Sequence, residues 1–221
     1  MNQKGGVGKT TCTVNLGAAL AELGRSVLLV DMDPQANLSL HFDLDIHELE
    51  ESTYSVLCQG SPVERAVVPN VRENLSILPA NIDLSGAEIE LASAIGRESV
   101  LRDAIGPYLA SHPVEFVLVD CPPSLGLLSL NALTFVREVF IPLQTEYFAL
   151  QGMTRLLDVV ELIRTRLNPE LSVTAIIPTM FDPRTNLSSE VIAETRKFFG
   201  DKVLSTVVRT NVRLAEAPSH G

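Results

Sequence analysis

Three glycines stand within four positions near the start of the chain, directly before a segment whose apolar residues have helical spacing. Glycine lets the backbone turn its N–H groups inward around phosphate oxygens, where a side chain would block the approach. The following helix adds the positive end of its dipole. The stretch predicts a phosphate-binding loop, and the alternative is a glycine-rich turn that merely precedes a helix. The residues of the predicted loop are Gly5, Gly6, Val7 and Gly8.

The three residues after the loop are polar, and each suits a different part of a bound nucleotide. Lys9 is placed to reach the β- and γ-phosphates, and Thr10 offers the hydroxyl that ligates Mg²⁺. Thr11 can bond the α-phosphate. Because a lysine and a hydroxyl follow the glycines at a helix start, the pattern is specific and predicts a nucleoside triphosphate site that also takes Mg²⁺.

Downstream, short apolar runs alternate with segments of helical periodicity. The runs are continuous, without a polar residue at every second position, which is typical of parallel strands covered on both faces. We therefore expect an α/β fold, a doubly wound and mostly parallel sheet with helices on both faces. The expected strands lie within residues 26–34, 75–80, 115–124, 138–144, 172–180 and 202–208.

Carboxylates follow two of the expected strands, at the edge of the sheet where such folds bind ligands. Asp120 comes after the run FVLV and fits the Walker B role of holding Mg²⁺, unless it merely ends a strand. Asp31 and Asp33 lie in DMDPQAN, and one of them is expected to orient the attacking water. Asp33 is also a candidate metal ligand. Pro34 stiffens this turn, which suits a switch segment that senses the γ-phosphate.

Composition limits the function classes that remain. The chain has 221 residues, enough for one α/β domain, and its net charge of −10 argues against nucleic acid unless a local patch exists. Only residues 155–221, with nine basic and eight acidic residues, are not acidic overall. The three cysteines are far apart, which argues against zinc and disulfides. No apolar run reaches the length of about 18 residues that a membrane span needs, so no membrane is expected.

Six segments resemble the ParA/Soj family of partition ATPases, which have deviant Walker motifs. The resemblance runs from the first residue to the last, and Gln3, where the usual loop pattern has glycine, is normal for the deviant form. The resemblance implies that Asp33 is the catalytic aspartate and that Asp120 binds magnesium. The segments are KGGVGKTT, LLVDMDPQAN, VDCPPSLG, LQTEYFALQG, TMFDPRTNL and NVRLAEAPSHG.

The resemblance also implies a role for Lys4, directly before the glycines. In this family the matching lysine crosses to the phosphates of the partner subunit in an ATP-sandwich homodimer, so Lys4 and Lys9 are both expected to assist catalysis. A second cation there stabilises charge in a loose transition state. From the sequence alone, Lys4 could equally be a solvated lysine.

The function implied by the resemblance is chromosome or plasmid segregation. ATP would close the dimer, the dimer would bind nucleoid DNA nonspecifically, and a ParB-like partner would stimulate hydrolysis in the cytoplasm. Arg184 and Arg213, expected in loops, match arginines that the family uses for DNA. Met180 and Pro218 are weaker candidates for the base pocket.

The resemblance suggests that residues 1–221 form a single ATPase domain shortened at both ends, because the family has a strand before the loop and a further strand and helix after APSHG. A MinD-like membrane-positioning ATPase stays open, although it needs an amphipathic helix. An iron-protein-like reductase would need two suitably placed cysteines. A non-catalytic nucleotide-binding adaptor is disfavoured by the presence of Lys9, Thr10, Asp33 and Asp120 together.

Overall fold

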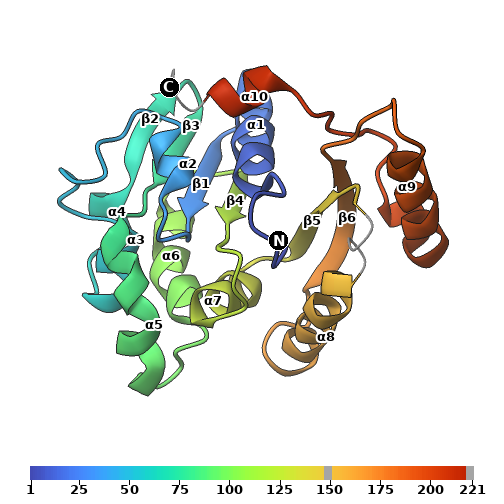
Figure 1. Cartoon of the computed structure of the whole chain (residues 1–221). Coiled ribbons are helices and arrows are strands. Elements are labelled where there is room, and N and C mark those ends of the chain that lie inside the picture. The colour runs from blue at the N-terminus through green and yellow to red at the C-terminus, as the bar shows by residue number, and fades with distance from the viewer. Residues whose placement is uncertain (147–150, 218–221) are drawn as a thin grey trace.

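The computed structural model describes residues 1–146 and 151–217, which form two β-sheets with helices packed around them (Figure 1). In the larger sheet the strand order is β2-β3-β1-β4. β1 pairs in parallel with β3 on one side and with β4 on the other, and β2 is an antiparallel edge strand. The strands are β1 (Val27–Asp31), β2 (Val68–Arg72), β3 (Leu75–Leu78) and β4 (Phe116–Asp120).

Helices cover both faces of the larger sheet. The helices before residue 147 are α1 (Lys9–Glu22), α2 (Asn37–Leu40), α3 (Thr53–Cys58), α4 (Val63–Ala66), α5 (Ala87–Glu90), α6 (Val100–Ser111) and α7 (Leu127–Phe135), with short 3₁₀ turns at Ile82–Gly86 and Leu91–Ser93. Every residue of β1 is buried. Leu28 and Val30 belong to the core shared with α3, α6 and α7, whereas Val27 and Leu29 belong to the core shared with α1 and α2. The predicted α/β class with a mostly parallel sheet is confirmed.

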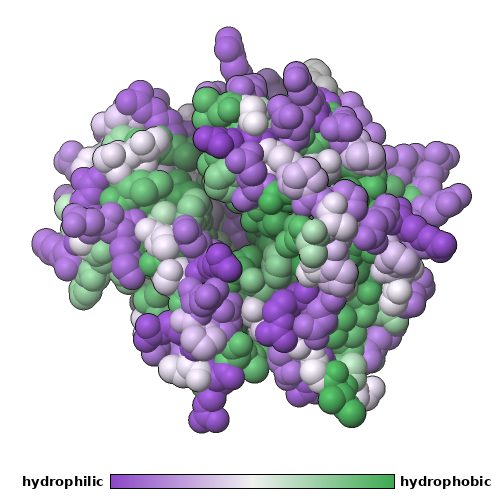
Figure 2. Space-filling model, turned by 180° about the vertical axis from the view of Figure 1, so that it is seen from behind, coloured by the Kyte–Doolittle hydropathy of each residue, from purple (hydrophilic) through white to green (hydrophobic). Residues whose placement is uncertain are grey.

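The smaller sheet pairs β5 (Glu138–Gln144) in parallel with β6 (Ser172–Thr179), and α8 (Gln151–Arg166) packs on it. Within the described residues β4 and β5 do not pair with each other, and residues 1–8 contain no strand. The side chain of Asn2 donates to the carbonyl of Pro142 in β5 at 2.7 Å. Seen from behind, a recess bordered by hydrophobic residues lies near the middle of the molecule (Figure 2).

The expectation of a strand within residues 202–208 is wrong. After α9 (Asn186–Phe199) the chain forms a 3₁₀ turn at Gly200–Lys202 and then runs beside β6, with isolated pairs but no continuous ladder. One reason is Pro178 in β6, which has no N–H to donate to a neighbouring strand. The last described helix is α10 (Val212–Glu216). None of the helices in residues 1–146 and 151–217 is long and apolar enough to cross a lipid bilayer.

Candidate nucleotide-binding site

The glycine-rich loop has the backbone shape that its sequence predicts. Gly6 has φ +72° and Gly8 has φ +88°, conformations that residues with a side chain rarely adopt. Val7 between them is buried, and its carbonyl accepts a hydrogen bond of 2.9 Å from the hydroxyl of Thr179. The end of β6 therefore anchors the loop, and α1 begins directly after it at Lys9.

Thr10 and Asp120, which are 110 positions apart, meet below the loop. The Thr10 hydroxyl donates to the Asp120 carboxylate at 2.6 Å. The Asp120 side chain is almost fully buried, and burial raises its pKa to about 6. The charge of Asp33 raises this pKa further, whereas the hydrogen bond from Thr10 and the charge of Lys9 oppose the shift.

This oxygen pair suits a magnesium ion. Mg²⁺ prefers hard oxygen ligands and is usually held by one or two protein groups, with phosphates and waters completing its shell. Thr10 and Asp120 supply one hydroxyl and one carboxylate at the same place. The described part of the chain has no group of three or more His, Cys, Asp or Glu side chains that could hold a metal, so a site shared with a nucleotide fits better than an all-protein cage.

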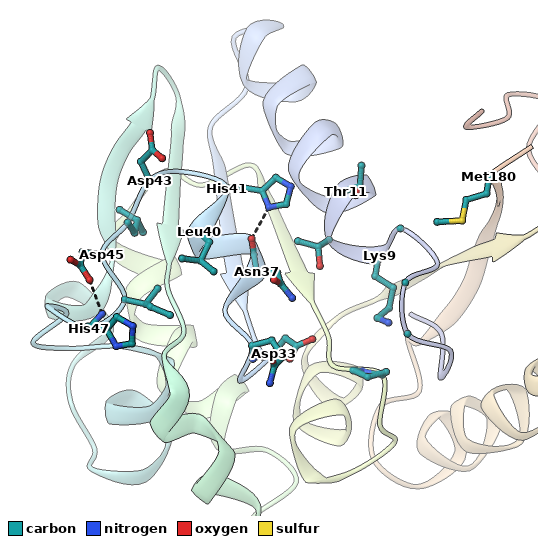
Figure 3. A pocket seen from close by; sticks show the side chains of 18 residues that line it. Lys9, Thr11, Asp33, Asn37, Leu40, His41, Asp43, Asp45, His47 and Met180 are labelled. Carbon is teal, nitrogen blue, oxygen red and sulfur yellow. Dashed lines mark hydrogen bonds between the residues drawn. The ribbon is translucent and has the colours of Figure 1, made fainter. Parts of the chain in front are cut away.

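Lys9 lies in the field of two carboxylates. Its pKa is lowered by partial burial, while the charges of Asp120 and Asp33 act in the opposite direction. Its ammonium donates to the backbone carbonyl of Lys4 at 3.3 Å. The ammonium lies beside the glycine-rich loop and faces the open cavity (Figure 3).

Asp31 at the end of β1 and Asp33 just after it are both buried, but they differ in their access to the cavity. Asp33 lines the cavity (Figure 3), and its carboxylate accepts a hydrogen bond of 3.0 Å from the N–H of Gln35. Asp31 is fully buried and does not line the cavity. Its pKa is raised to about 7, first by burial and then by the charge of Asp120. Of the two carboxylates, only that of Asp33 can therefore reach a ligand directly.

The cavity has a volume of about 980 Å³. Met180 borders it on one side of Lys9 and residues 37–47 border it on the other (Figure 3). Asp120 and Val7 are buried and do not line it, and the remaining predicted nucleotide residues, apart from Lys4 and Pro218, do line it. Pro218 falls outside the described residues.

The cavity wall formed by residues 37–47 was not predicted from the sequence. Gln35 and Asn37 belong to the singled-out stretch DPQAN, but the residues after them have no periodicity or motif that could indicate a site. The polar residues of this wall are Asn37, His41, Asp43, Asp45 and His47, and Gln35 lies just before it.

Lys4 does not line the cavity that its own loop helps to form. Its ammonium makes a short ion pair with the carboxylate of Glu146, which follows β5. About half of each side chain is exposed, 54% for Lys4 and 51% for Glu146. The other oxygen of Glu146 accepts a hydrogen bond from the Gln144 amide.

The two candidate DNA-binding residues, Arg184 and Arg213, do not line the cavity. Arg184 precedes α9 as expected, and its guanidinium donates three hydrogen bonds of 2.9, 3.3 and 2.7 Å to the carboxylate of Asp182. These bonds hold the pKa of Asp182 at about 2. Arg213 was expected in a loop, but it lies in α10, where the Asn211 side chain caps its N–H and orders the first turn.

Comparison with known sequences places the chain among partition proteins. The family described as AAA domain matches residues 1–173. The chain is 48% identical to the sporulation initiation inhibitor protein Soj of Bacillus subtilis, over all of this chain and 86% of that protein. It is 47% identical to the chromosome partitioning protein ParA of Caulobacter vibrioides and 46% identical to the chromosome-partitioning ATPase Soj of Treponema pallidum, covering 82% and 85% of them.

Solved structures agree on the fold. A cobyrinic acid a,c-diamide synthase from Mycobacterium smegmatis with bound ADP and magnesium superposes with a TM-score of 0.89 at 38% identity, covering 99% of this chain and 89% of that one. A plasmid partition protein from Borrelia burgdorferi bound to AMPPNP gives 0.80 at 25% identity, covering 96% and 86%. With 46–48% identity to partition proteins along its whole length, the chain belongs to the ParA/Soj family of chromosome-partitioning P-loop ATPases.

Proposed function

We propose that this chain is a Mg²⁺- and ATP-dependent dimerising switch for chromosome or plasmid segregation, and that residues 1–221 act as one P-loop ATPase domain. One observation carries the proposal. The Thr10–Asp120 hydrogen bond, the ammonium of Lys9 and the carboxylate of Asp33 gather around one cavity at the N-terminus of α1. This combination suits both the binding of a nucleoside triphosphate and the hydrolysis of its terminal phosphate.

In this proposal the loop N–H groups and Lys9 hold the β- and γ-phosphates, and Thr11 bonds the α-phosphate. Thr10 and Asp120 hold Mg²⁺, which supplies positive charge to the phosphates. The carboxylate of Asp33 accepts a hydrogen bond from the attacking water and so orients it. Met180 contacts the base, a role that we also propose for Pro218.

Dimerisation would complete the site. Lys4 does not line the cavity of its own chain, and its side chain is half exposed, which supports a role on the phosphates of a partner copy. Hydrolysis would then depend on a closed homodimer. We further propose that this dimer binds DNA nonspecifically through Arg184 and Arg213, associates with the nucleoid in the cytoplasm, and is released when a ParB-like partner stimulates hydrolysis.

The test measures ATP binding and phosphate release by the wild-type chain and by Asp33→Ala. We expect slow turnover for the wild type with Mg²⁺. Asp33→Ala should keep its affinity for ATP and should still dimerise, but it should release no phosphate, because the water is no longer oriented. A wild-type chain that binds ATP without any turnover, even with duplex DNA and a ParB-like protein, would favour the non-catalytic adaptor.

The alternative of a MinD-like ATPase is distinguished by the surface to which the ATP-bound dimer binds. Co-sedimentation with anionic lipid vesicles would support it, whereas ATP-dependent binding to random duplex DNA supports the partition function. The mycobacterial neighbour carries the name of an amide-forming synthase. No observation on the described residues favours that function, and the curated relatives with higher identity are partition proteins.

A further inference from the structure

Asp31 is a buried carboxylate that the proposed hydrolysis does not use. It ends β1, is 0% exposed, and accepts three hydrogen bonds. One oxygen accepts the N–H of Asp33 at 3.1 Å, and the other accepts the N–H and the hydroxyl of Ser39 at 3.0 and 2.7 Å. All three donors come from one segment, residues 33–39, so this carboxylate joins the two ends of that segment.

Ser39 extends the connection to a second strand. Its hydroxyl donates to Asp31 and also accepts a hydrogen bond of 3.0 Å from the N–H of Ala80, shortly after β3. Both Ser39 and Ala80 are 0% exposed. Because a buried polar group that loses its partner costs free energy, this chain of bonds resists being opened one bond at a time.

The segment between the two ends has little freedom. Ala36 is fully buried and has φ +51°, a left-handed conformation that is unfavourable for an alanine. Its N–H donates to the carbonyl of Asp33 at 2.8 Å, and the N–H of Gln35 donates to the carboxylate of Asp33. These contacts fix the direction in which the Asp33 side chain leaves the turn.

We propose that Asp31 and Ser39 form a clamp, defined by these two residues, that directs the carboxylate of Asp33 into the cavity. Asp31 acts through Asp33 and is therefore a positioning residue. The inference rests on the proposed role of Asp33 in hydrolysis. Misplacing a reacting group by about 1 Å can cost roughly 100-fold in rate, so a loosened turn is expected to impair turnover while nucleotide binding persists.

The test compares Asp31→Ala and Ser39→Ala with Asn131→Ala as a matched control. Asn131 is also 0% exposed and makes three hydrogen bonds, with Arg97, Leu127 and Leu101, but it lies on α7, where it contacts α6, and does not line the cavity. In both clamp variants kcat should fall roughly 10- to 100-fold. The dissociation constant for a fluorescent ATP analogue should change less than about three-fold, because the loop and Lys9 are untouched.

Two further measurements separate positioning from a general loss of stability. The double variant Asp31→Ala/Ser39→Ala should lose no more kcat than the worse single variant, since the two residues act as one unit. Amide hydrogen exchange should accelerate at Asp33 and Ala80 in Asp31→Ala, but not in Asn131→Ala.

The proposal is overturned if the clamp variants lose no more kcat than Asn131→Ala at similar melting temperatures, or if exchange at Asp33 and Ala80 is unchanged. An absence of turnover in the wild-type chain would instead refute the proposed hydrolysis. In that case the exchange measurement still decides whether Asp31 and Ser39 restrain the turn.

Discussion

The ammonium of Lys4 is paired with the carboxylate of Glu146, 142 positions further along the same chain. Under the proposed function Lys4 serves the phosphates of a partner copy, so this ion pair must open before the dimer closes. Both side chains are half exposed, and ion pairs of this kind contribute little free energy. The contact can therefore hold Lys4 in the monomer without preventing its release.

Glu146→Gln should favour the dimer, because Lys4 no longer has to leave a charged partner. We expect the ATP-dependent dimer to become tighter by at most about five-fold, with ATP binding by the monomer unchanged. Sedimentation equilibrium in the Asp33→Ala background measures this without loss of ATP. Glu161→Gln is the matched control, since its ion pair with Arg164 on α8 has similar exposure. A weaker dimer in Glu146→Gln alone would contradict the account.

The two lysines of the loop should fail in different ways. Lys9→Ala should lower ATP affinity roughly 10- to 100-fold, because a charged group that touches the phosphates is removed. Lys4→Ala should bind ATP with near wild-type affinity but stay monomeric and inactive. Titration with a fluorescent ATP analogue and light scattering report the two properties separately. Normal dimerisation and turnover in Lys4→Ala would show that the lysine has no role on a partner copy.

Local features of the site were predictable from the sequence. Gly6 and Gly8 have positive φ values, which glycine favours. The lysine and threonine that follow them are the first two residues of α1, so their place beside the loop is set by the local sequence. The approach of Asp120 to Thr10 followed from the rule that ligands gather at the carboxyl ends of parallel strands.

Features that depend on tertiary packing were not predictable. The residues of DMDPQAN alone left both Asp31 and Asp33 open, and only the family resemblance pointed to Asp33. Tertiary packing decides that Asp31 is fully buried, whereas Asp33 lines the cavity. The pairing of Lys4 with Glu146 has no local signal. The strand expected within residues 202–208 had suitable composition, but its neighbour β6 carries Pro178 and cannot provide a regular ladder.

Stability of the nucleotide-free chain should depend on pH through the two buried carboxyls. The folded-state pKa values, about 7 for Asp31 and about 6 for Asp120, lie above the ordinary value of 3.8. Between about pH 4 and pH 7 the folded chain therefore binds more protons than the unfolded chain, so the free energy of unfolding decreases as pH rises through this window. Asp182, whose pKa is lowered to about 2, acts in the opposite sense at more acidic pH. The buried amino group of Met1, whose pKa burial lowers from 8.0 to about 6, partly offsets the two carboxyls between about pH 6 and pH 8.

We expect the melting temperature to be higher at pH 5.5 than at pH 7.5, and calorimetry without nucleotide measures the difference. Asp31→Asn should reduce this difference, because an amide carries no charge at either pH. The control Asp43→Asn changes an exposed carboxylate on the cavity wall and should leave the difference unchanged. A melting temperature that rises with pH over this range would contradict the prediction.

The last prediction concerns DNA, which a chain of net charge −10 can bind only through a concentrated patch. The guanidinium of Arg184 is bound to Asp182, whereas the exposed Arg213 has no ion pair among residues 1–146 and 151–217. If both arginines contact phosphates, Arg213→Ala and Arg184→Ala should each weaken binding to random duplex DNA and reduce the salt slope by about one per lost contact.

Asp182→Asn gives the opposite test, because it removes a competing carboxylate and should tighten binding. Arg164→Ala removes the same charge from α8, an element that carries neither Arg184 nor Arg213, and controls for the change in net charge. All variants are compared with ATP in the Asp33→Ala background, by fluorescence anisotropy over a series of salt concentrations. Loss of a direct phosphate contact must change both the affinity for DNA and the salt slope. If the Arg184 and Arg213 variants match Arg164→Ala in both, the proposal that these two arginines bind DNA is wrong.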